Sequence, residues 1–396
     1  MTAHPIVKIM GFHGRDLSAY LPTVSAGTNY GSIIVGAVAP FTLRWAKTGG
    51  ALSEDSIVSH SVGSAGHDPE GSSSGMVDTI PNSAGISDGA STMFHSLGGS
   101  LAHGLGFHRT GADIFLCLRG DLTDGDAWLG TVALAGGGDR WQWRTWRGGG
   151  GDQLSWMAQV RHYNTSGALL EDSGVKAVRA ETIGFASCQY VCFGNELTAD
   201  NLVYKVSDVV FVSGGGWAPL ANVVALFPDS LGSNTQWTLG AGADKWTATN
   251  EAPPDDDTSY IERLLSGSTE TLNLSASGVT LTGDEIWLAA EAYIRFRHVS
   301  GTGAYRPIYI INGVSYGPSA LAGSTSYQYF RHCTALPAGI TTAMIDAAEA
   351  GILTSGGTSI TRRCTQILLE VAYGILEPYE SYGSGPALGS VNVGVY

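Results

Sequence analysis

The chain is built from short apolar runs separated by breaks rich in glycine, serine and threonine. Glycine alone accounts for 55 of the 396 residues, about twice its usual share. Hydrophobic residues make up 43% and charged residues 14%, the opposite of the balance that keeps a chain disordered. Apolar runs of this length between turn residues favour β-strands over helices. The sequence therefore predicts a globular all-β protein, and its length favours two domains.

The predicted strands form two groups, one on each side of a glycine run. A strong strand over 202–212 is followed by glycines at 214–216, which we interpret as a flexible linker. This predicts an N-terminal β-sandwich domain at 1–213 and a C-terminal β-sandwich domain at 217–396. The run 285–299 is long enough to require a bulge. One short helix is expected over 341–350, capped by Thr341 or Thr342 and ended by Gly351.

The charge balance is acidic, with 21 Lys and Arg against 35 Asp and Glu, for a net charge of −14. Nucleic-acid binding relies on clustered Lys and Arg that contact phosphates. The nearest approach to such a cluster is the single pair Arg362-Arg363. We therefore expect no nucleic-acid partner and interpret the acidic excess as an aid to solubility.

The N-terminus, the apolar runs and the cysteines bear on secretion, membrane insertion and disulfide formation. Residues 1–12 lack a basic segment followed by a long apolar core, so we interpret them as a first strand rather than a signal peptide. No window approaches the roughly 18 apolar residues of a membrane span, and we expect no membrane insertion. The five cysteines are odd in number and widely spaced, which predicts buried thiols rather than disulfides.

Three segments of the second half together resemble a known group of proteins. Residues 254–261 are an acidic turn that runs into Thr-Ser-Tyr-Ile, residues 336–352 combine Leu-Pro-Ala-Gly-Ile with the predicted helix and Gly-Ile, and 365–373 is a closing strand. Over residues 217–375 this pattern resembles the jelly-roll or concanavalin-like domains of tailed-phage virion proteins, without their Pro-x-Thr-Gly-x-x-Trp-Thr lead-in to the helix.

The resemblance implies two tandem jelly-roll or concanavalin-like sandwiches in a non-enzymatic component of a tailed-phage virion. The implied positions are the tail, a fibre or the head decoration, and assembly would take place in the host cytoplasm. The implied partners are other virion structural proteins and further copies of the same chain, in threefold or sixfold arrangement.

Concanavalin-like sandwiches include glycoside hydrolases, which use paired carboxylates. Glu285 and Glu291 share one face of a predicted strand but would lie roughly 20 Å apart. Retaining enzymes need about 5 Å and inverting enzymes about 6.5–9.5 Å. No nucleophile elbow and no His-Glu-x-x-His helix is present. We predict solvent-facing glutamates that flank a packed or partly exposed Trp287, and no enzymatic role; a polysaccharide depolymerase is the least favoured alternative.

The triple acid Asp255, Asp256 and Asp257 has two interpretations. In the first, the acids form a turn in which an Asp side chain accepts hydrogen bonds from the next backbone amides. In the second, they contribute to a calcium site at the rim of the sandwich. Three consecutive side chains cannot all point inward, so we favour the turn. No other cofactor is expected.

Aromatic residues are concentrated in the first half at Trp141, Trp143, Trp146 and Trp156, with Arg144 among them. Core packing is the default for such residues, whereas exposed aromatics with polar neighbours form sugar-binding faces. These five residues therefore define an alternative function. In it the protein is a carbohydrate-binding module on a fibre and recognises a glycan of the host cell surface.

Overall fold

The computed structural model describes residues 217–376, with short gaps at 265–266, 300–302, 320 and 356–359. In the first 213 residues it describes mainly the strands and a few short flanking pieces. The described chain forms four antiparallel sheets in sandwich-like arrangements, with a single helix of five residues, α2 (Thr342–Asp346). The predicted all-β fold is confirmed.

The first two sheets come from the first half of the chain. Sheet A has nine strands in the order β13-β12-β11-β6-β16-β4-β3, with β1 on β16 and β14 on β12, and sheet B has seven in the order β10-β9-β8-β7-β15-β5-β2. The strands of sheet A are β1 (Ile6–Met10), β3 (Ser32–Val35), β4 (Phe41–Ala46), β6 (Gly71–Thr79), β11 (Asp139–Arg147), β12 (Ser155–Tyr163), β13 (Leu169–Asp172), β14 (Lys176–Arg179) and β16 (Val203–Ser213). The strands of sheet B are β2 (Thr23–Val24), β5 (Ile57–Ser61), β7 (Met93–Leu97), β8 (Gly104–Thr110), β9 (Asp113–Arg119), β10 (Gly130–Ala133) and β15 (Cys188–Gly194).

The other two sheets come from the second half. Sheet C has the order β19-β20-β28-β22-β26 with β17 on β28, and sheet D has the order β18-β21-β27-β23-β24 with β25 on β23. The strands of sheet C are β17 (Leu220–Leu226), β19 (Thr238–Ala241), β20 (Tyr260–Arg263), β22 (Glu285–His298), β26 (Gln328–Ala335) and β28 (Arg362–Ile375). The strands of sheet D are β18 (Pro228–Thr235), β21 (Thr269–Leu274), β23 (Ala304–Ile311), β24 (Val314–Tyr316), β25 (Leu321–Ala322) and β27 (Glu349–Ser355).

Sheets C and D enclose the main hydrophobic core. Sheet C contributes buried residues such as Ile294 and Leu369, and sheet D contributes residues such as Leu272, Tyr309 and Ile352. These side chains alternate along their strands with residues on the opposite face, as a pleated strand requires. Two aliphatic and aromatic layers therefore interdigitate to form the sandwich.

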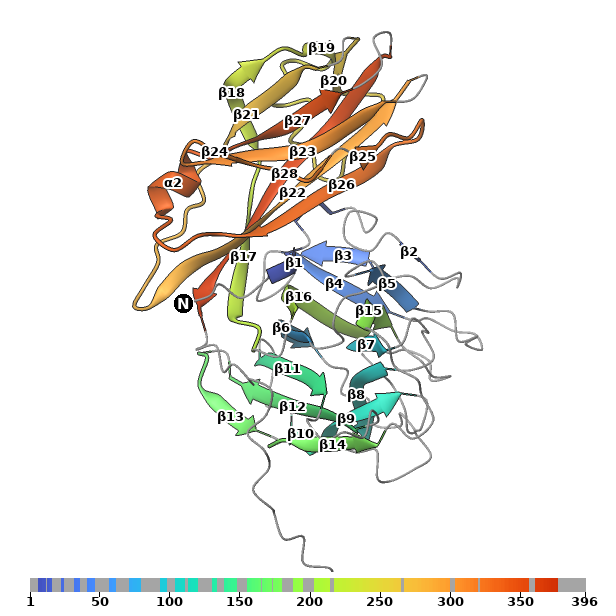
Figure 1. Ribbon diagram of the computed structural model, residues 1–396, viewed down its shortest axis with the longest axis vertical. Helices are drawn as coiled ribbons and strands as arrows, with labels where there is room; N and C mark the ends of the chain where they lie inside the picture. The colour runs from blue at the N-terminus through green and yellow to red at the C-terminus, as the bar shows by residue number, and fades with distance from the viewer. Residues whose placement is uncertain are drawn as a thin grey trace, which may run out of the picture.

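The other face of sheet C is also covered, by strands of sheet A. A second apolar cluster joins Ile9 of β1 and Val210 of β16 to Val223, Leu288 and Ala372 of the second half. Figure 1 shows β1, in blue, beside the orange and red strands β22, β26 and β28. Burial on both faces explains why β22 and β28 are nearly continuous runs of buried residues rather than alternating ones.

Several local predictions can now be compared with the structure. The bulge expected in 285–299 is confirmed, since the register of β22 on β28 shifts between Trp287 and Ala289 and again between Arg295 and Phe296. The helix starts as predicted, because the Thr341 hydroxyl accepts a hydrogen bond from the Met344 amide at 3.3 Å. It ends early, at Asp346, so the predicted helical residues 349–350 and Gly351 belong instead to β27.

The run 245–249, whose sequence Lys-Trp-Thr-Ala-Thr predicts a strand, is a turn in the structure. In this turn the Asp244 carboxylate accepts from the Thr247 amide at 2.8 Å and from its hydroxyl at 2.7 Å. The glycines 214–216 lie outside the described residues, so the division into domains at that point stays a prediction. No helix in the described part of the chain is long and apolar enough to cross a membrane.

Candidate functional site

The acidic turn before β20 is held by its first aspartate. The Asp255 carboxylate accepts hydrogen bonds from the Ser259 amide and the Ser259 hydroxyl, each at 2.9 Å. The Thr258 amide donates to the Asp255 carbonyl at 3.4 Å, and Asp256 adopts φ 57°, a left-handed conformation that aspartate tolerates better than most residues. The turn predicted for the triple acid is present: the side chain of Asp255 accepts a hydrogen bond from a backbone amide that follows it in the chain.

The second aspartate of the turn binds an arginine of sheet C. Arg295 of β22 donates from Nε to Asp256 Oδ1 at 2.5 Å and from an η nitrogen to Oδ2 at 2.9 Å. This two-point geometry matches the planar guanidinium to the planar carboxylate and is the strong form of such an ion pair. It fixes the plane and the direction of the Arg295 side chain.

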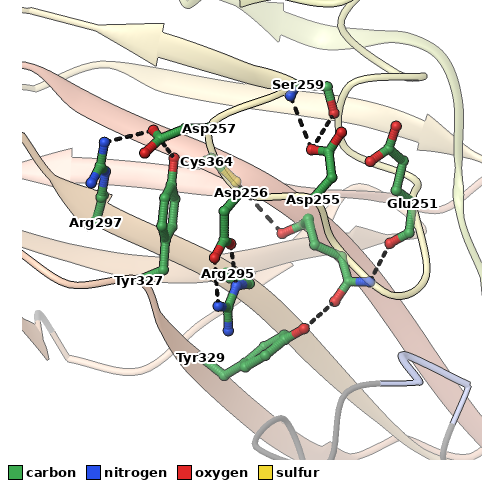
Figure 2. A network of polar contacts seen from close by, with 11 residues as sticks. Glu251, Asp255, Asp256, Asp257, Ser259, Arg295, Arg297, Tyr327, Tyr329 and Cys364 are labelled. Carbon is green, nitrogen blue, oxygen red and sulfur yellow. Dashed lines mark hydrogen bonds and ion pairs between the residues drawn. The ribbon is translucent and has the colours of Figure 1, made fainter.

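The third aspartate joins three strands. Asp257 accepts from Arg297 of β22 at 2.6 Å and from Arg363 of β28 at 3.0 Å. It also accepts from the hydroxyl of Tyr327, which precedes β26, at 3.2 Å. Burial, followed by the charge of Asp257, raises the pKa of Tyr327 above its usual value, so the phenol keeps the proton that it donates. Figure 2 shows the turn reaching over the ends of these strands.

Each of the three arginines also stacks on a tyrosine ring. Arg363 lies 4.1 Å from the ring centre of Tyr260, Arg297 lies 4.6 Å from that of Tyr327, and Arg295 lies 5.1 Å from that of Tyr329. These distances are within the range of favourable cation–π contacts. We call this set the Tyr–Arg surface: Tyr260, Tyr327, Tyr329, Arg295, Arg297 and Arg363.

The Tyr–Arg surface is anchored but still accessible. All six of its side chains are partly exposed, and its arginines are 16–23% exposed. Beneath it, Tyr329 donates to Gln366 at 2.8 Å, and Gln366 donates in turn to the Glu251 carbonyl. Asp256, Asp257 and Glu262 oppose the three guanidinium charges, Glu262 at 3.5 Å from Arg363. The surface therefore consists of planar rings and guanidinium groups that are held rigidly, and its net charge is close to zero.

The arrangement could be partly anticipated from the strand pattern. Arg295 and Arg297 alternate with the buried Ile294 and Phe296 along β22, and Tyr327 and Tyr329 have the same spacing beside them. A period of two places such residues on one face of a sheet. Which strands lie next to one another was not evident from the sequence, so the meeting of tyrosines and arginines was missed.

The calcium interpretation of Asp255, Asp256 and Asp257 stays a prediction. Within the part of the chain that the structure describes, no group of three or more His, Cys, Asp or Glu could hold a metal ion. The three carboxylates accept hydrogen bonds from the protein donors described above, and three of those donors are guanidinium groups. What this turn does in the protein is orient arginines.

The predicted solvent-facing position of Glu291 is wrong. Glu291 is 2% exposed, because β1 covers it: it forms an ion pair with Lys8 and accepts from the Ile9 amide at 3.0 Å. Glu285 is half-buried and accepts from the amide and hydroxyl of Thr282 at 2.8 and 2.9 Å. Of the two positions left open for Trp287, the structure shows the packed one, since this residue is 2% exposed.

A close pair of carboxylates nevertheless exists, between neighbouring strands. Glu291 of β22 lies directly opposite Glu370 of β28, a separation typical of cross-strand neighbours at about 5 Å. Glu370 is fully buried and accepts from the Gly11 and His13 amides at 2.8 and 3.0 Å. Both carboxylates accept hydrogen bonds from backbone amides, and Glu291 is also paired with Lys8. Because both are buried, a substrate has no access to them. The pair fastens the N-terminal segment to sheet C.

The predicted aromatic site can be placed only in part. Trp141, Trp143 and Trp146 belong to β11 and Trp156 to β12, but their side chains lie outside the described residues, so a glycan contact there stays a prediction. Arg144 is 2% exposed. Its guanidinium binds Gln159 at 2.7 Å and lies 4.2 Å from the ring centre of Trp217. In this position Arg144 joins sheet A to the first residues of the second half.

Comparison with known proteins gives likenesses of fold. No protein-family model and no curated protein matches the sequence. Among solved structures, the cellulose-induced protein Cip1 is similar at 10% identity with a TM-score of 0.35, over 52% of this chain and 97% of that one. The receptor-binding domain of botulinum neurotoxin type G is similar at 11% identity with a TM-score of 0.31, over 71% and 77%.

A third similar structure is the N-terminal tandem of CBM22 domains from Paenibacillus barcinonensis Xyn10C. Its identity is 10% and its TM-score 0.25, over 93% of this chain and 98% of that one.

Proposed function

We propose that this protein is a non-enzymatic binding protein whose Tyr–Arg surface recognises a neutral glycan. The observation that carries the proposal is the stacking of three ion-paired arginines on three partly exposed tyrosines at one end of sheet C. Tyrosine rings offer flat faces to the C–H side of a sugar, and phenol and guanidinium groups supply hydrogen bonds to its hydroxyls.

The fixed geometry of the surface supports binding. A side chain that is already held in one conformation loses little entropy when a ligand arrives. Here Asp256 and Asp257 hold the arginines, and the arginines hold the tyrosine rings. Tyrosine and arginine are also the residues that most often dominate binding energy at protein surfaces. The acidic turn therefore contributes indirectly, by presenting the residues that would touch the ligand.

The charge of the site supports a neutral ligand. Three carboxylates oppose the three guanidinium groups, and the whole chain carries −14. A polyanion would gain little from such a balanced surface and would be repelled by the protein as a whole. A hydroxyl-rich, uncharged glycan avoids both difficulties.

The biological setting that we propose is an attachment or decoration protein of a tailed-phage virion, present in several copies. What supports this setting is the sequence resemblance of residues 254–261, 336–352 and 365–373. Immunogold labelling of purified particles and light scattering of the isolated protein test it. A stable monomer whose antibody labels no particle would contradict the setting, while leaving the glycan proposal standing.

A glycan array tests the binding proposal. The purified full chain, fluorescently labelled, is expected to bind a subset of neutral glycans and to ignore heparin fragments and other polyanions. A Tyr327→Ala variant should lose this signal, whereas Val314→Ala, at an exposed position of sheet D, should keep it. If Trp143→Ala with Trp146→Ala removed the signal and Tyr327→Ala did not, the predicted tryptophan site would replace the Tyr–Arg surface.

A further inference from the structure

A pocket lies where the two halves of the chain meet, and the glycan proposal does not use it. Its volume is about 300 Å³, at the small end of ligand sites, which prefer interfaces between domains. Residues of β11, β12 and the following turn line one side, and residues of β17, β22 and β28 line the other. The lining residues are Arg140, Tyr163, Ser166, Gly167, Leu220, Asn222, Glu285, Gly374 and Ile375.

The polar groups of the pocket are held in place by the protein. Arg140 donates to the Ala221 carbonyl at 2.8 Å and to the Asn222 side-chain oxygen, which leaves the Asn222 amide nitrogen as a donor. In the turn before β22, the amide and the hydroxyl of Thr282 both donate to Glu285 Oε2, at 2.8 and 2.9 Å. Glu285 Oε1 has no hydrogen-bond partner among the described residues. The pocket thus offers a fixed acceptor beside fixed donors.

The remaining walls are apolar or open. Leu220 and Ile375 supply hydrocarbon surface, and Ile375 is 55% exposed. At Gly167 no atom lies within 4 Å of the position that a Cβ would occupy, so the turn leaves free space at the rim. Gly167 has φ +80°, which favours glycine at this position.

These features select a class of ligand. Arg140 and Glu285 carry opposite charges, so neither an anion nor a cation is favoured by the pair together. A sugar hydroxyl both donates and accepts, and can satisfy Glu285 and Asn222 at once. The C–H face of a sugar ring suits Leu220 and Ile375. We propose that this pocket binds a small neutral carbohydrate of one or two rings.

This site is distinct from the Tyr–Arg surface. Glu285 begins β22 and Arg297 lies near its end, roughly 40 Å apart along an extended strand. Because both halves of the chain line the pocket, a bound sugar contacts both and stabilises their packed arrangement. Binding therefore raises the thermal stability of the whole protein by mass action.

Ligand-observed NMR and isothermal titration with glucose, galactose, N-acetylglucosamine, maltose and lactose test the proposal. We expect at least one of these probes to saturate the full-length protein. Glu285→Gln should weaken it about tenfold or more, because the single amide oxygen is engaged by the Thr282 donors and an NH₂ group then faces the sugar in place of an acceptor. Asp284→Asn, a matched change at an exposed neighbour, should leave the affinity unchanged.

A second variant separates the site from a folding effect and from the other surface. Ile375→Ala removes part of the apolar wall at an exposed position and should also weaken the same probe, while Tyr327→Ala should not. Saturation by none of the five sugars would overturn the proposal. So would saturable binding that Glu285→Gln and Ile375→Ala both leave intact, or preference for acetate or methylammonium over every sugar.

Discussion

At the scale of single residues, the most unusual feature is the number of charges buried where sheet A covers sheet C. Lys8 and Glu291 are each 2% exposed and form an ion pair, and Tyr293 donates to the Ile9 carbonyl at 2.7 Å. Burial lowers the pKa of Lys8 to about 8, while Glu291 opposes the shift. The Lys8 ammonium is therefore protonated at neutral pH. A buried charge is tolerated only while its partner remains.

Replacing Lys8 alone should therefore destabilise the folded protein. Lys8→Met leaves the Glu291 charge buried without its partner, and we expect the free energy of unfolding to fall by about 3 kcal/mol or more. The double change Lys8→Met with Glu291→Gln removes both charges and keeps an acceptor for the Ile9 amide. It should recover most of the loss in urea denaturation followed by tryptophan fluorescence. Equal losses in the single and double variants would show that the ion pair does not matter.

Asp208 makes the stability of the same region depend on pH. It is buried, its carboxylate accepts from the Val223 amide at 3.2 Å, and burial raises its pKa from 3.8 to about 6 against the opposing charges of Arg140 and His13. The folded protein thus holds this proton more tightly than the unfolded chain does. The resulting stability is present below about pH 4 and is lost as the pH rises through about 6.

Between pH 4 and pH 7, the titration of Asp208 should lower the free energy of unfolding by about 2 kcal/mol. Asp208→Asn keeps a side-chain acceptor, tolerates the φ of 51° and cannot titrate. The difference in stability between wild type and Asp208→Asn should therefore shift by that amount across this range. Parallel pH profiles for the two proteins would contradict the assignment.

At the scale of elements, the sequence predicts strands well where apolar runs are long and continuous, and poorly where packing overrides local preference. The long run at 285–299 corresponds to β22, and the closing strand at 365–373 corresponds to most of β28. β27 was read as the end of a helix because Ala347, Ala348 and Ala350 favour helices. Its central place in sheet D, paired with both β21 and β23, decides otherwise. At 245–249 the Asp244 side chain competes for backbone amides and stops a strand.

Gly351 shows what the central place of β27 requires. A Cβ at this position would lie 1.9 Å from the Glu270 carbonyl oxygen of β21, closer than any real contact, and both atoms belong to rigid sheet backbone. Gly351→Ala should force β21 and β27 apart and lower the free energy of unfolding by about 2–3 kcal/mol. Ser355→Ala, at the exposed end of the same strand, should change it by less than about 0.5 kcal/mol. Chemical denaturation of both variants decides the point.

At the scale of the whole molecule, sheet C is a shared layer. Sheet D covers one of its faces through the main core, and sheet A covers part of the other through a smaller apolar cluster and buried ion pairs. Alternation of apolar and polar residues along a strand indicates which residues share a face of the sheet, but it does not indicate which other element covers that face. For this reason Glu291 was expected in solvent, and the role of Glu370 was missed. The Tyr–Arg surface lies on the part of sheet C that sheet A leaves uncovered.

Binding of a neutral glycan at the Tyr–Arg surface is tested most directly by calorimetric titration. The strongest neutral ligand from the array is titrated into wild type, Tyr327→Phe and Tyr327→Ala. We predict that Tyr327→Phe, which keeps the stacked ring, retains most of the affinity. Tyr327→Ala should lose about tenfold or more with its circular dichroism spectrum unchanged. Wild-type affinity in a folded Tyr327→Ala protein would contradict the account.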